Sequence, residues 1–307
     1  MIRFKIGGGL GNQMFQYAFL YSQMKKMNKL SSPVEMIMHR NKNEDLRNFT
    51  LDVYNCSIPM KVTTEDKTTI DYFFINNFRK VICKTCRLLQ IPDSKIIMIL
   101  NRFGIIYAPD IYEYYDQLKV NNNTQFIEGA FQSWKYFDVY RQDIISEFLC
   151  KEKISLSNEK ILNMIKRSNS VCVHIRRGDY VNSFYSKSLA ICNYDYYEKG
   201  IRYICEKVNN PHFFIFTNSH EDHEWIKKKY HFDVKVTYVD LNNTDYDELR
   251  LMSYCKHFII ANSTFSWWAQ YLSTNKEKIV VAPSIWNRDV KNTQELYQNF
   301  WKLIDVN

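Results

Sequence analysis

The sequence predicts an α/β protein made of two domains, each built on a parallel sheet. In the second half of the chain, apolar strand-like runs alternate with helical segments at short spacing, as in a parallel sheet with helices on both faces. Near the start, a glycine-rich loop joins an expected strand to an expected helix. The length of 307 residues also favours two domains, at roughly 150 residues each.

The first half of the chain contains few legible elements. We expect a strand at 2–6, a helix over 14–27 and a second strand at 33–39. The periodicity then weakens, and the pattern does not order residues 60–125 into helices and strands.

A polar stretch at 151–160 is the expected linker between the domains. The predicted domains are therefore 1–150 and 151–307, two Rossmann-like α/β units that face a cleft. We expect the last helix of the chain to pack back on the first domain.

The second half contains five apolar runs that predict strands. These runs lie at 171–175, 213–218, 234–240, 258–262 and 278–284. Between them, Ser219 with Asp222 and Thr244 with Asp247 have the spacing of helix N-caps. In an open parallel sheet, ligands bind at the carboxyl ends of the strands, so we searched those ends for polar residues.

Composition and charge narrow the function classes. The chain is 46% hydrophobic with 22 Tyr and 20 Phe, so it folds, and its net charge of +8 suits an anionic ligand or an anionic membrane surface. The charge is too diffuse to indicate nucleic-acid binding. The densest basic stretch is interleaved with Ile, Leu and Met, as in an interfacial amphipathic helix, although a solvated helix face is the commoner explanation. Its cations are Arg79, Lys80, Lys84, Arg87, Lys95 and Arg102.

No apolar signal segment and no apolar run of about 18 residues is present, so we expect a cytoplasmic protein. A peripheral contact with the inner membrane stays open. The eight cysteines are expected to be reduced, and Cys83 and Cys86 lack the further ligands of a zinc site.

The glycine loop at 7–11 lies where backbone amides can receive an anion. Neither common phosphate motif fits, because Asn12 stands where a dinucleotide fingerprint needs its third glycine and no Gly-Lys-Ser/Thr follows. A tight turn with a positive φ explains the loop equally well.

The stretch at 171–181 carries the clearest polar cluster. Strand alternation places His174 and Arg176 on one face, and Arg177 and Asp179 follow at the carboxyl end. Arginine suits a diphosphate because its planar fork donates two charge-assisted hydrogen bonds. A surface Arg–Asp pair is the alternative, but two arginines after a buried strand favour an anion site.

A third stretch continues the fourth predicted strand into an apolar helix. Ser263, Thr264 and Ser266 at this junction offer hydroxyls and helix N-terminal amides to an anion, with ordinary N-capping as the alternative. Asp245 and Asp247 match the DxD pattern that holds manganese in many glycosyltransferases, but at a helix start we expect them to act as caps.

Five segments in order resemble the α-1,2-fucosyltransferase family of bacteria and animals (glycosyltransferase family 11), which are similar to GT-B enzymes that use GDP-β-L-fucose. They are GGGLGNQMFQYAF, EGAFQSWKYF at 128–137, HIRRGDYV, FTNSHEDHEWIKKKY and DELRLMSYCKHFIIANSTFSWWAQYL. The resemblance implies inverting, metal-independent transfer of fucose to the 2-hydroxyl of a terminal galactoside, in glycan, O-antigen or capsule synthesis. It implies no resident cofactor, GDP-fucose as co-substrate and a galactose-terminated acceptor, with a lipid-linked acceptor left open.

The resemblance also implies roles for individual residues. The implied donor-binding residues are Gly9, Asn12, His174, Arg176, Asn218, Ser263, Thr264 and Ser266. Arg176 would act on the β-phosphate as a catalytic residue, and Asn218, where more distant relatives have an aspartate, would approach the guanine. Asp179 is the candidate general base, and Glu128 and Gln132 are candidates on the acceptor side.

Two alternatives stay open. One is a GT-B transferase with another nucleotide sugar or another linkage, such as α-1,6. The other is a non-catalytic sugar-binding module in which Trp267, Trp268 and Trp286 stack on sugar rings.

Overall fold

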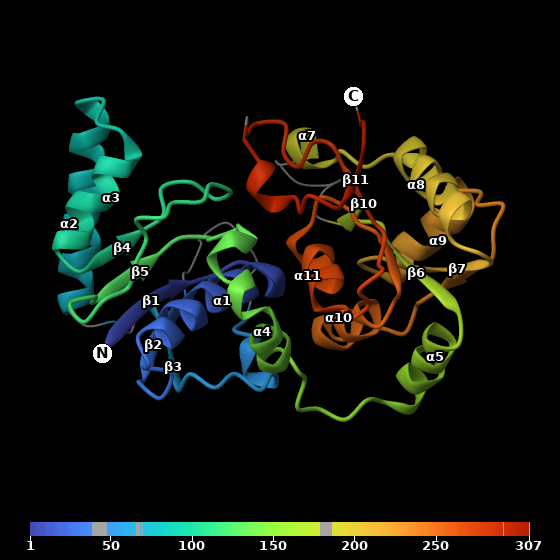
Figure 1. Cartoon of the computed structure of the whole chain (residues 1–307), viewed down its shortest axis with the longest axis horizontal. Coiled ribbons are helices and arrows are strands. Elements are labelled where there is room, and N and C mark those ends of the chain that lie inside the picture. Colours follow the sequence, from blue (N-terminus) through green and yellow to red (C-terminus); the bar gives the residue numbers. More distant parts are fainter. Residues whose placement is uncertain (39–47, 66–67, 69, 179–185, 291, 307) are drawn as a thin grey trace. The chain divides into compact units, whose positions relative to one another are not determined.

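The structure, a computed structural model, describes the chain except residues 39–47, 66–67, 69, 179–185, 291 and 307 (Figure 1). Residue contacts divide the chain into two compact units. Unit 1 comprises Met1–Leu149 and Gln294–Leu296, and unit 2 comprises Cys150–Thr293 and Tyr297–Asn307.

Unit 1 contains a parallel sheet of strand order β3-β2-β1-β5-β4. Its strands are β1 (Ile2–Ile6), β2 (Val34–Met38), β3 (Met60–Thr64), β4 (Ile105–Tyr107) and β5 (Phe126–Glu128). Its helices are α1 (Leu10–Lys26), α2 (Ile70–Leu88), α3 (Asp93–Arg102) and α4 (Arg141–Glu147), with 3-10 turns η1 (Leu51–Val53), η3 (Trp134–Tyr136), η4 (Asp138–Tyr140) and η5 (Gln294–Leu296).

Alternation in β1 explains how this sheet is covered. Phe4 is fully buried on the α1 side, where its ring lies 5.9 Å from that of Phe131, which in turn stacks on Phe19 of α1 at 3.8 Å. Arg3 and Lys5 face the other way and form ion pairs on the α2 side. The sheet therefore has one apolar face and one face that carries buried charge.

Unit 2 contains a parallel sheet of strand order β11-β10-β9-β6-β7-β8. Its strands are β6 (Asn169–His174), β7 (Pro211–Phe216), β8 (Val236–Tyr238), β9 (His257–Ile259), β10 (Val280–Pro283) and β11 (Lys302–Ile304). Its helices are α5 (Leu156–Lys166), α7 (Ser186–Leu189), α8 (Tyr194–Lys207), α9 (His220–Lys229), α10 (Asp245–Ser253) and α11 (Thr264–Leu272). Both units are α/β with wholly parallel sheets, so the predicted fold class is confirmed.

The two faces of β6 have different partners. Val171, Val173 and Ile175 pack into a core with Tyr196 and Tyr197 of α8. Figure 1 shows α8 and α9 on one side of this sheet and α10 and α11 on the other. The opposite face of β6, which carries His174, is therefore the face of α10 and α11.

Several predicted boundaries need correction. Helix α1 begins at Leu10, four positions before the expected start, and the expected linker at 151–160 contains the start of α5, where the Ser155 hydroxyl accepts a hydrogen bond from the Asn158 N–H (3.3 Å). The last helical element of the described residues is the 3-10 turn η5, which its contacts assign to unit 1, and β11 follows it. The predicted caps are confirmed, because Ser219 and Thr244 accept from the N–H groups three residues on.

Each sheet reverses its strand order at one point. In unit 2 the chain proceeds from β6 to β7 and β8 on one side, and then continues with β9 on the other side of β6. In unit 1 the corresponding point lies between β1 and β5. Ligands of open α/β sheets bind at the carboxyl ends of the strands at such switch points.

Candidate functional site

The switch point of unit 2 brings together two of the segments that the sequence singled out. Strands β6 and β9 are neighbours in register, with Val173 opposite Ile259. Arg176 follows β6, and the start of α11 follows β9. The His174 ring lies 5.9 Å from the Phe265 ring, which joins the two segments directly. An arginine and a helix N-terminus thus lie at the same edge of the sheet, a combination that suits an anion.

His174 has a buried ring nitrogen, Nδ1, that could accept or donate a hydrogen bond to a ligand. Its side chain is 2% exposed, and within the described part of the chain its Nδ1 has no hydrogen-bond partner. Burial, together with the nearby charge of Arg176, lowers the pKa of His174 to about 3, so the ring is neutral near pH 7. Buried polar atoms in folded proteins are nearly always satisfied, and a bound ligand would satisfy this one.

Arg177 is held by contacts within unit 2. Its Nε lies 3.1 Å from Oδ1 of Asp222, and its guanidinium lies 3.3 Å from the centre of the Trp225 ring. The Gly178 N–H donates to the other Asp222 oxygen (3.3 Å), and the Arg177 N–H donates to Oδ1 of Asn218 (3.2 Å). Asp222, Trp225 and Asn218 therefore fix the turn that carries Arg176, and the amide oxygen of Asn218 already has a partner.

The turn before α11 is shaped by its own hydroxyls. The Ser263 hydroxyl accepts from the Phe265 N–H (3.3 Å) as an N-cap. Ser266 is fully buried, and its hydroxyl donates to the carbonyls of Ala261 and Ser263, both at 3.3 Å. The Ser266 hydroxyl therefore stabilises the turn, and its role in donor binding stays a prediction. Thr264, the first residue of α11, is half-buried at the helix start.

Asn262 is a positioning residue that the sequence analysis missed. Its Nδ2 donates to the carbonyls of Leu189 (2.9 Å) and Trp286 (3.0 Å), so it ties the turn to two distant segments of unit 2. Its position directly before Ser263 and Thr264 was the feature of the sequence that could have indicated this role.

Glu248 of α10 is a second residue that the sequence analysis missed. Burial and, to a smaller extent, the carboxylate of Asp245 raise the pKa of Glu248 to about 8 against the opposing effect of the nearby Arg176 charge. A carboxyl group and an arginine therefore lie on the same face of the sheet. Glu248 falls within the DELRL segment, but only the tertiary fold shows that it approaches Arg176.

The pKa of Glu248 predicts how stability depends on pH. Between the ordinary carboxyl value of 4.5 and about 8, the folded state holds a proton that the unfolded state has released, so this group lowers the free energy of unfolding as pH rises. The Glu248→Gln variant should be more stable than wild type by about 1–3 kcal/mol at pH 8.5 and no more stable near pH 5. Chemical unfolding at both pH values measures this difference, and parallel pH profiles would contradict it.

Asp245 and Asp247 lie in the first turn of α10, whose N-cap is Thr244. The Asp247 N–H donates to the Thr244 hydroxyl (3.4 Å), which in turn donates to Oδ2 of Asp247 (3.1 Å), and Asp247 lies 3.5 Å from Arg250. Asp247 therefore takes part in the cap that Thr244 makes, and both acids lie where the helix dipole favours them.

The switch point of unit 1 holds the glycine loop. Gly8 has a φ of +79°, and a Cβ there would lie 2.4 Å from the Asn12 side chain, so the positive-φ turn is confirmed at this residue. Gly9 is the N-cap of α1 in an extended conformation. The Gly7 N–H donates to the side chain of Gln16 (3.1 Å), and this hydrogen bond connects the loop to α1.

Two predicted residues from distant segments meet at this point. The Gln132 side chain donates to Oδ1 of Asn12 (3.1 Å), which links the exit of β5 to the start of α1. Glu128 points elsewhere, to the α2 face, where Lys5 and Arg79 flank its carboxylate. Asp179, the candidate general base, lies outside the described residues.

The aromatic residues expected of a sugar-binding module are core residues. Trp267 and Trp268 are fully buried and Trp286 is 2% exposed. None of the three can stack on a sugar ring at the surface, so this alternative loses its basis.

A family model and several curated relatives match this chain over nearly its whole length. The family model described as glycosyl transferase family 11 matches residues 1–305. The O-antigen biosynthesis glycosyltransferase WbnK of Escherichia coli is 30% identical over 96% of this chain and 98% of its own length, and an alpha-1,2-colitosyltransferase of the same species is 30% identical over 98% of both. A galactoside 2-alpha-L-fucosyltransferase of Caenorhabditis elegans is 26% identical over 97% of this chain and 74% of its own length. Among solved structures, the fucosyltransferase NodZ from Bradyrhizobium superposes with a TM-score of 0.49 at 11% identity, over 88% of this chain and 92% of that chain.

Proposed function

The chain belongs to glycosyl transferase family 11, and on that premise we propose that it transfers L-fucose from GDP-β-L-fucose to the 2-hydroxyl of a terminal galactoside, with inversion and without a metal ion. The observation that carries this proposal is the placement of Arg176 and the start of α11 on the two strands of the unit 2 switch point. Charge from the one and amides from the other suit a sugar diphosphate.

The proposed reaction is a single displacement. The galactose hydroxyl attacks the anomeric carbon, the bond to the β-phosphate oxygen breaks, and negative charge grows on the departing GDP. Arg176 and the α11 N-terminus would stabilise that charge, which is the usual task of preorganised donors in a transition state. Thr264 at the first position of α11 would contribute its hydroxyl.

The base of the nucleotide would meet the α10 face. Guanine presents two adjacent N–H donors on its edge, and a carboxylate accepts both. Glu248 supplies that carboxylate beside Arg176, and Nδ1 of His174 supplies a second polar contact. Unit 1 would supply the acceptor subsite, with Asn12 and Gln132 at its switch point.

The role of Glu248 predicts a pH-dependent affinity for GDP. Because the pKa of Glu248 is raised to about 8, guanine binding must remove a proton near pH 7, and affinity should increase several-fold between pH 7 and 8.5. Calorimetric titration of GDP at both pH values should show this increase in wild type but not in Glu248→Gln. The same increase in the variant would remove Glu248 from the guanine subsite.

Product analysis tests the proposed activity. Incubation with GDP-fucose, a β-galactoside and excess EDTA should yield an α-(1→2)-linked fucosyl galactoside, identified by NMR. A product linked at another hydroxyl would contradict the acceptor position, and activity only with added manganese would contradict metal independence. An Asp179→Asn variant in the same assay tests the candidate base. This substitution should lower the rate of transfer without lowering the affinity for GDP.

A second donor follows from one relative. The colitosyltransferase is as similar to this chain as any relative named above, and colitose is L-fucose without its 3-hydroxyl. Competition between GDP-fucose and GDP-colitose for one galactoside separates the two. A kcat/KM that favours GDP-colitose would move the donor assignment while leaving the diphosphate site unchanged.

A further inference from the structure

Helix α2 of unit 1 is oriented against its own hydrophobic pattern. Its buried stripe includes Asn76 and Arg79, which are 9% and 6% exposed. Its opposite side carries large apolar side chains in solvent, with Phe74 65%, Val81 62% and Leu88 75% exposed. Soluble proteins rarely expose contiguous apolar surface of this kind without a function for it.

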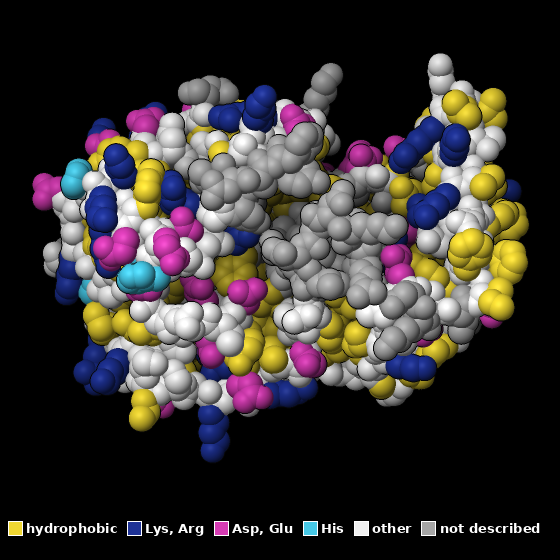
Figure 2. Space-filling view, turned by 180° about the vertical axis from the view of Figure 1, so that it is seen from behind, with side chains coloured by type: hydrophobic (Ala, Val, Ile, Leu, Met, Phe, Trp, Pro, Cys, Tyr) yellow, Lys and Arg dark blue, Asp and Glu magenta, His cyan; other side chains and the backbone are white. Residues whose placement is uncertain are grey.

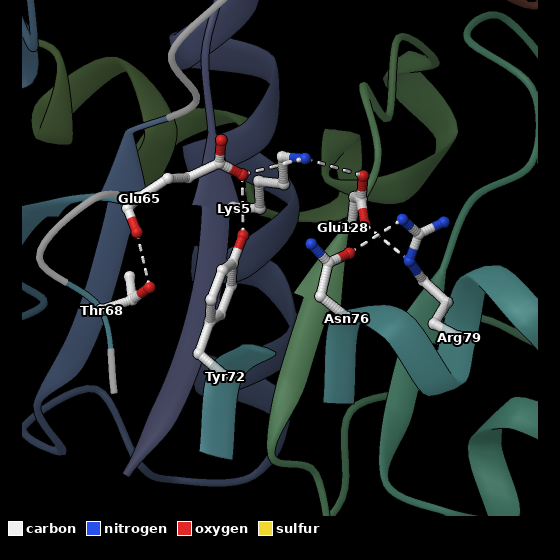
Figure 3. Close-up of polar contacts among 7 residues, drawn as sticks. All are labelled: Lys5, Glu65, Thr68, Tyr72, Asn76, Arg79 and Glu128. Atoms are coloured by element: carbon white, nitrogen blue, oxygen red, sulfur yellow. Dashed lines mark hydrogen bonds and ion pairs between the residues drawn. The ribbon is translucent and has the colours of Figure 1, made fainter. Parts of the chain in front are cut away.

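A partly buried polar network fixes this orientation (Figure 3). Nε of Arg79 lies 2.8 Å from Glu128 of β5, and Lys5 of β1 bridges Glu128 (3.4 Å) and Glu65 (3.2 Å). The Tyr72 hydroxyl of α2 donates to the same Glu65 oxygen at 2.9 Å. Rotating α2 to bury its apolar side would break these contacts and leave charges unpaired, so the exposed face is built into the fold.

The exposed apolar surface continues beyond α2. The Phe78 ring lies 5.1 Å from the ring of Phe103, which follows α3. Helices α2 and α3 follow one another in the chain as a hairpin, and we call their exposed apolar area the hairpin surface. Its exposed apolar residues are Ile70, Phe73, Phe74, Phe78, Val81, Leu88, Leu89, Met98 and Phe103. Figure 2 shows hydrophobic side chains gathered over this part of unit 1, with Lys and Arg side chains beside them.

Cations flank the apolar side chains. Lys80, Lys84 and Arg87 lie along one flank of the α2 stripe, and all three are exposed. Together with Tyr107 and Arg79, they line a pocket of about 410 Å³. Two further exposed cations of the hairpin lie on α3. The structure describes all of residues 70–103, and Asp71 is the sole exposed acid among them. The α3 cations are Lys95 and Arg102.

We propose that the hairpin surface docks unit 1 on an anionic lipid bilayer. A straight helix of 19 residues with an apolar stripe and flanking cations matches a flat surface that is apolar below and negatively charged at its head groups. The basic pocket would receive a head-group phosphate. Among the described residues, no helix combines the length and apolar character needed to span a membrane.

The charges favour a bilayer over a second copy of the chain. A twofold interface on this surface would bring the same cation row of each copy together, with a single exposed acid to oppose it. An anionic bilayer satisfies the apolar side chains and the cations at once. This inference is independent of the proposed activity, because binding needs neither donor nor acceptor.

Vesicle co-sedimentation of the full chain tests the proposal. Wild type should bind vesicles of phosphatidylcholine and phosphatidylglycerol (7:3) at least tenfold more tightly than pure phosphatidylcholine vesicles. Phe74→Ser/Val81→Ser should lose at least tenfold in affinity for the mixed vesicles. Lys80→Gln/Lys84→Gln should lose the preference for phosphatidylglycerol and the dependence on salt.

Matched variants elsewhere serve as controls. Val139→Ser/Leu156→Ser replaces two apolar residues that are 74% and 79% exposed, and Lys228→Gln/Lys229→Gln replaces two exposed lysines of α9. Both should bind like wild type, and every variant should keep the wild-type circular dichroism. The proposal is overturned if wild type binds both kinds of vesicle equally well. It is also overturned if the control variants lose as much affinity as the variants of the hairpin surface. A self-association that Phe74→Ser/Val81→Ser abolishes would equally overturn it, by assigning the surface to a second copy.

Discussion

Replacing Arg176 with alanine is expected to lower kcat for sugar transfer by about 10²- to 10³-fold while leaving unit 2 folded. The guanidinium follows β6 at the switch point, where it can donate to charge that develops on the departing diphosphate. Its removal therefore costs more in the transition state than in the ground state, and GDP affinity should fall much less than kcat. Steady-state kinetics and GDP titration measure the two effects.

The adjacent arginine provides the matched control. Arg177→Ala removes the ion pair with Asp222 and the stacking on Trp225, and should lower the free energy of unfolding by about 1–3 kcal/mol. Any loss of activity in this variant should be recovered in part by lowering the temperature. If Arg177→Ala lost kcat at unchanged stability while Arg176→Ala stayed active, the assignment of the two residues would be reversed.

The second large effect concerns the partly buried network beneath α2. Glu128→Leu leaves Arg79 without its carboxylate, and we expect a loss of about 2–4 kcal/mol in the free energy of unfolding. Arg79→Met should cost less, because Lys5 still neutralises Glu128. Chemical unfolding of both variants measures these values.

The double variant distinguishes a paired charge from simple packing. Arg79→Met/Glu128→Leu removes both charges, and should be more stable than Glu128→Leu alone because no cation is left without its partner. Additive losses in the double variant would show that the two side chains act independently. Vesicle binding by the same variants would report whether the orientation of α2 depends on the pair.

The second half of the chain was predictable because its strands are continuous apolar runs. Strands β6 and β7 are buried on both faces, with five consecutive buried residues in each, and uninterrupted apolar runs of three and four residues mark them in the sequence. In the first half, β1, β2 and most of α1 lie where the sequence predicted them, but β3, β4 and β5 were not predicted, because β4 and β5 have three residues each and β3 is a polar edge strand. Helix α2 was harder still, since its buried side carries Asn76 and Arg79.

The candidate site was predictable where a strand end carried it. Arg176 and Ser263 follow buried strands, and parallel strands place their carboxyl ends at one edge. Glu248 was missed because its side chain approaches Arg176 from a helix, a relation that exists only in the tertiary fold. Arg177 and Ser266 looked equivalent to their neighbours in sequence, but their contacts in the structure are internal.

GDP release from GDP-fucose, with and without a β-galactoside and in excess EDTA, tests the central claim most directly. Acceptor-dependent release in wild type that falls at least a hundredfold in Arg176→Ala is the predicted result. A rate of GDP release that is the same with and without the galactoside, or that is undiminished in Arg176→Ala, would contradict transfer at the switch point of unit 2.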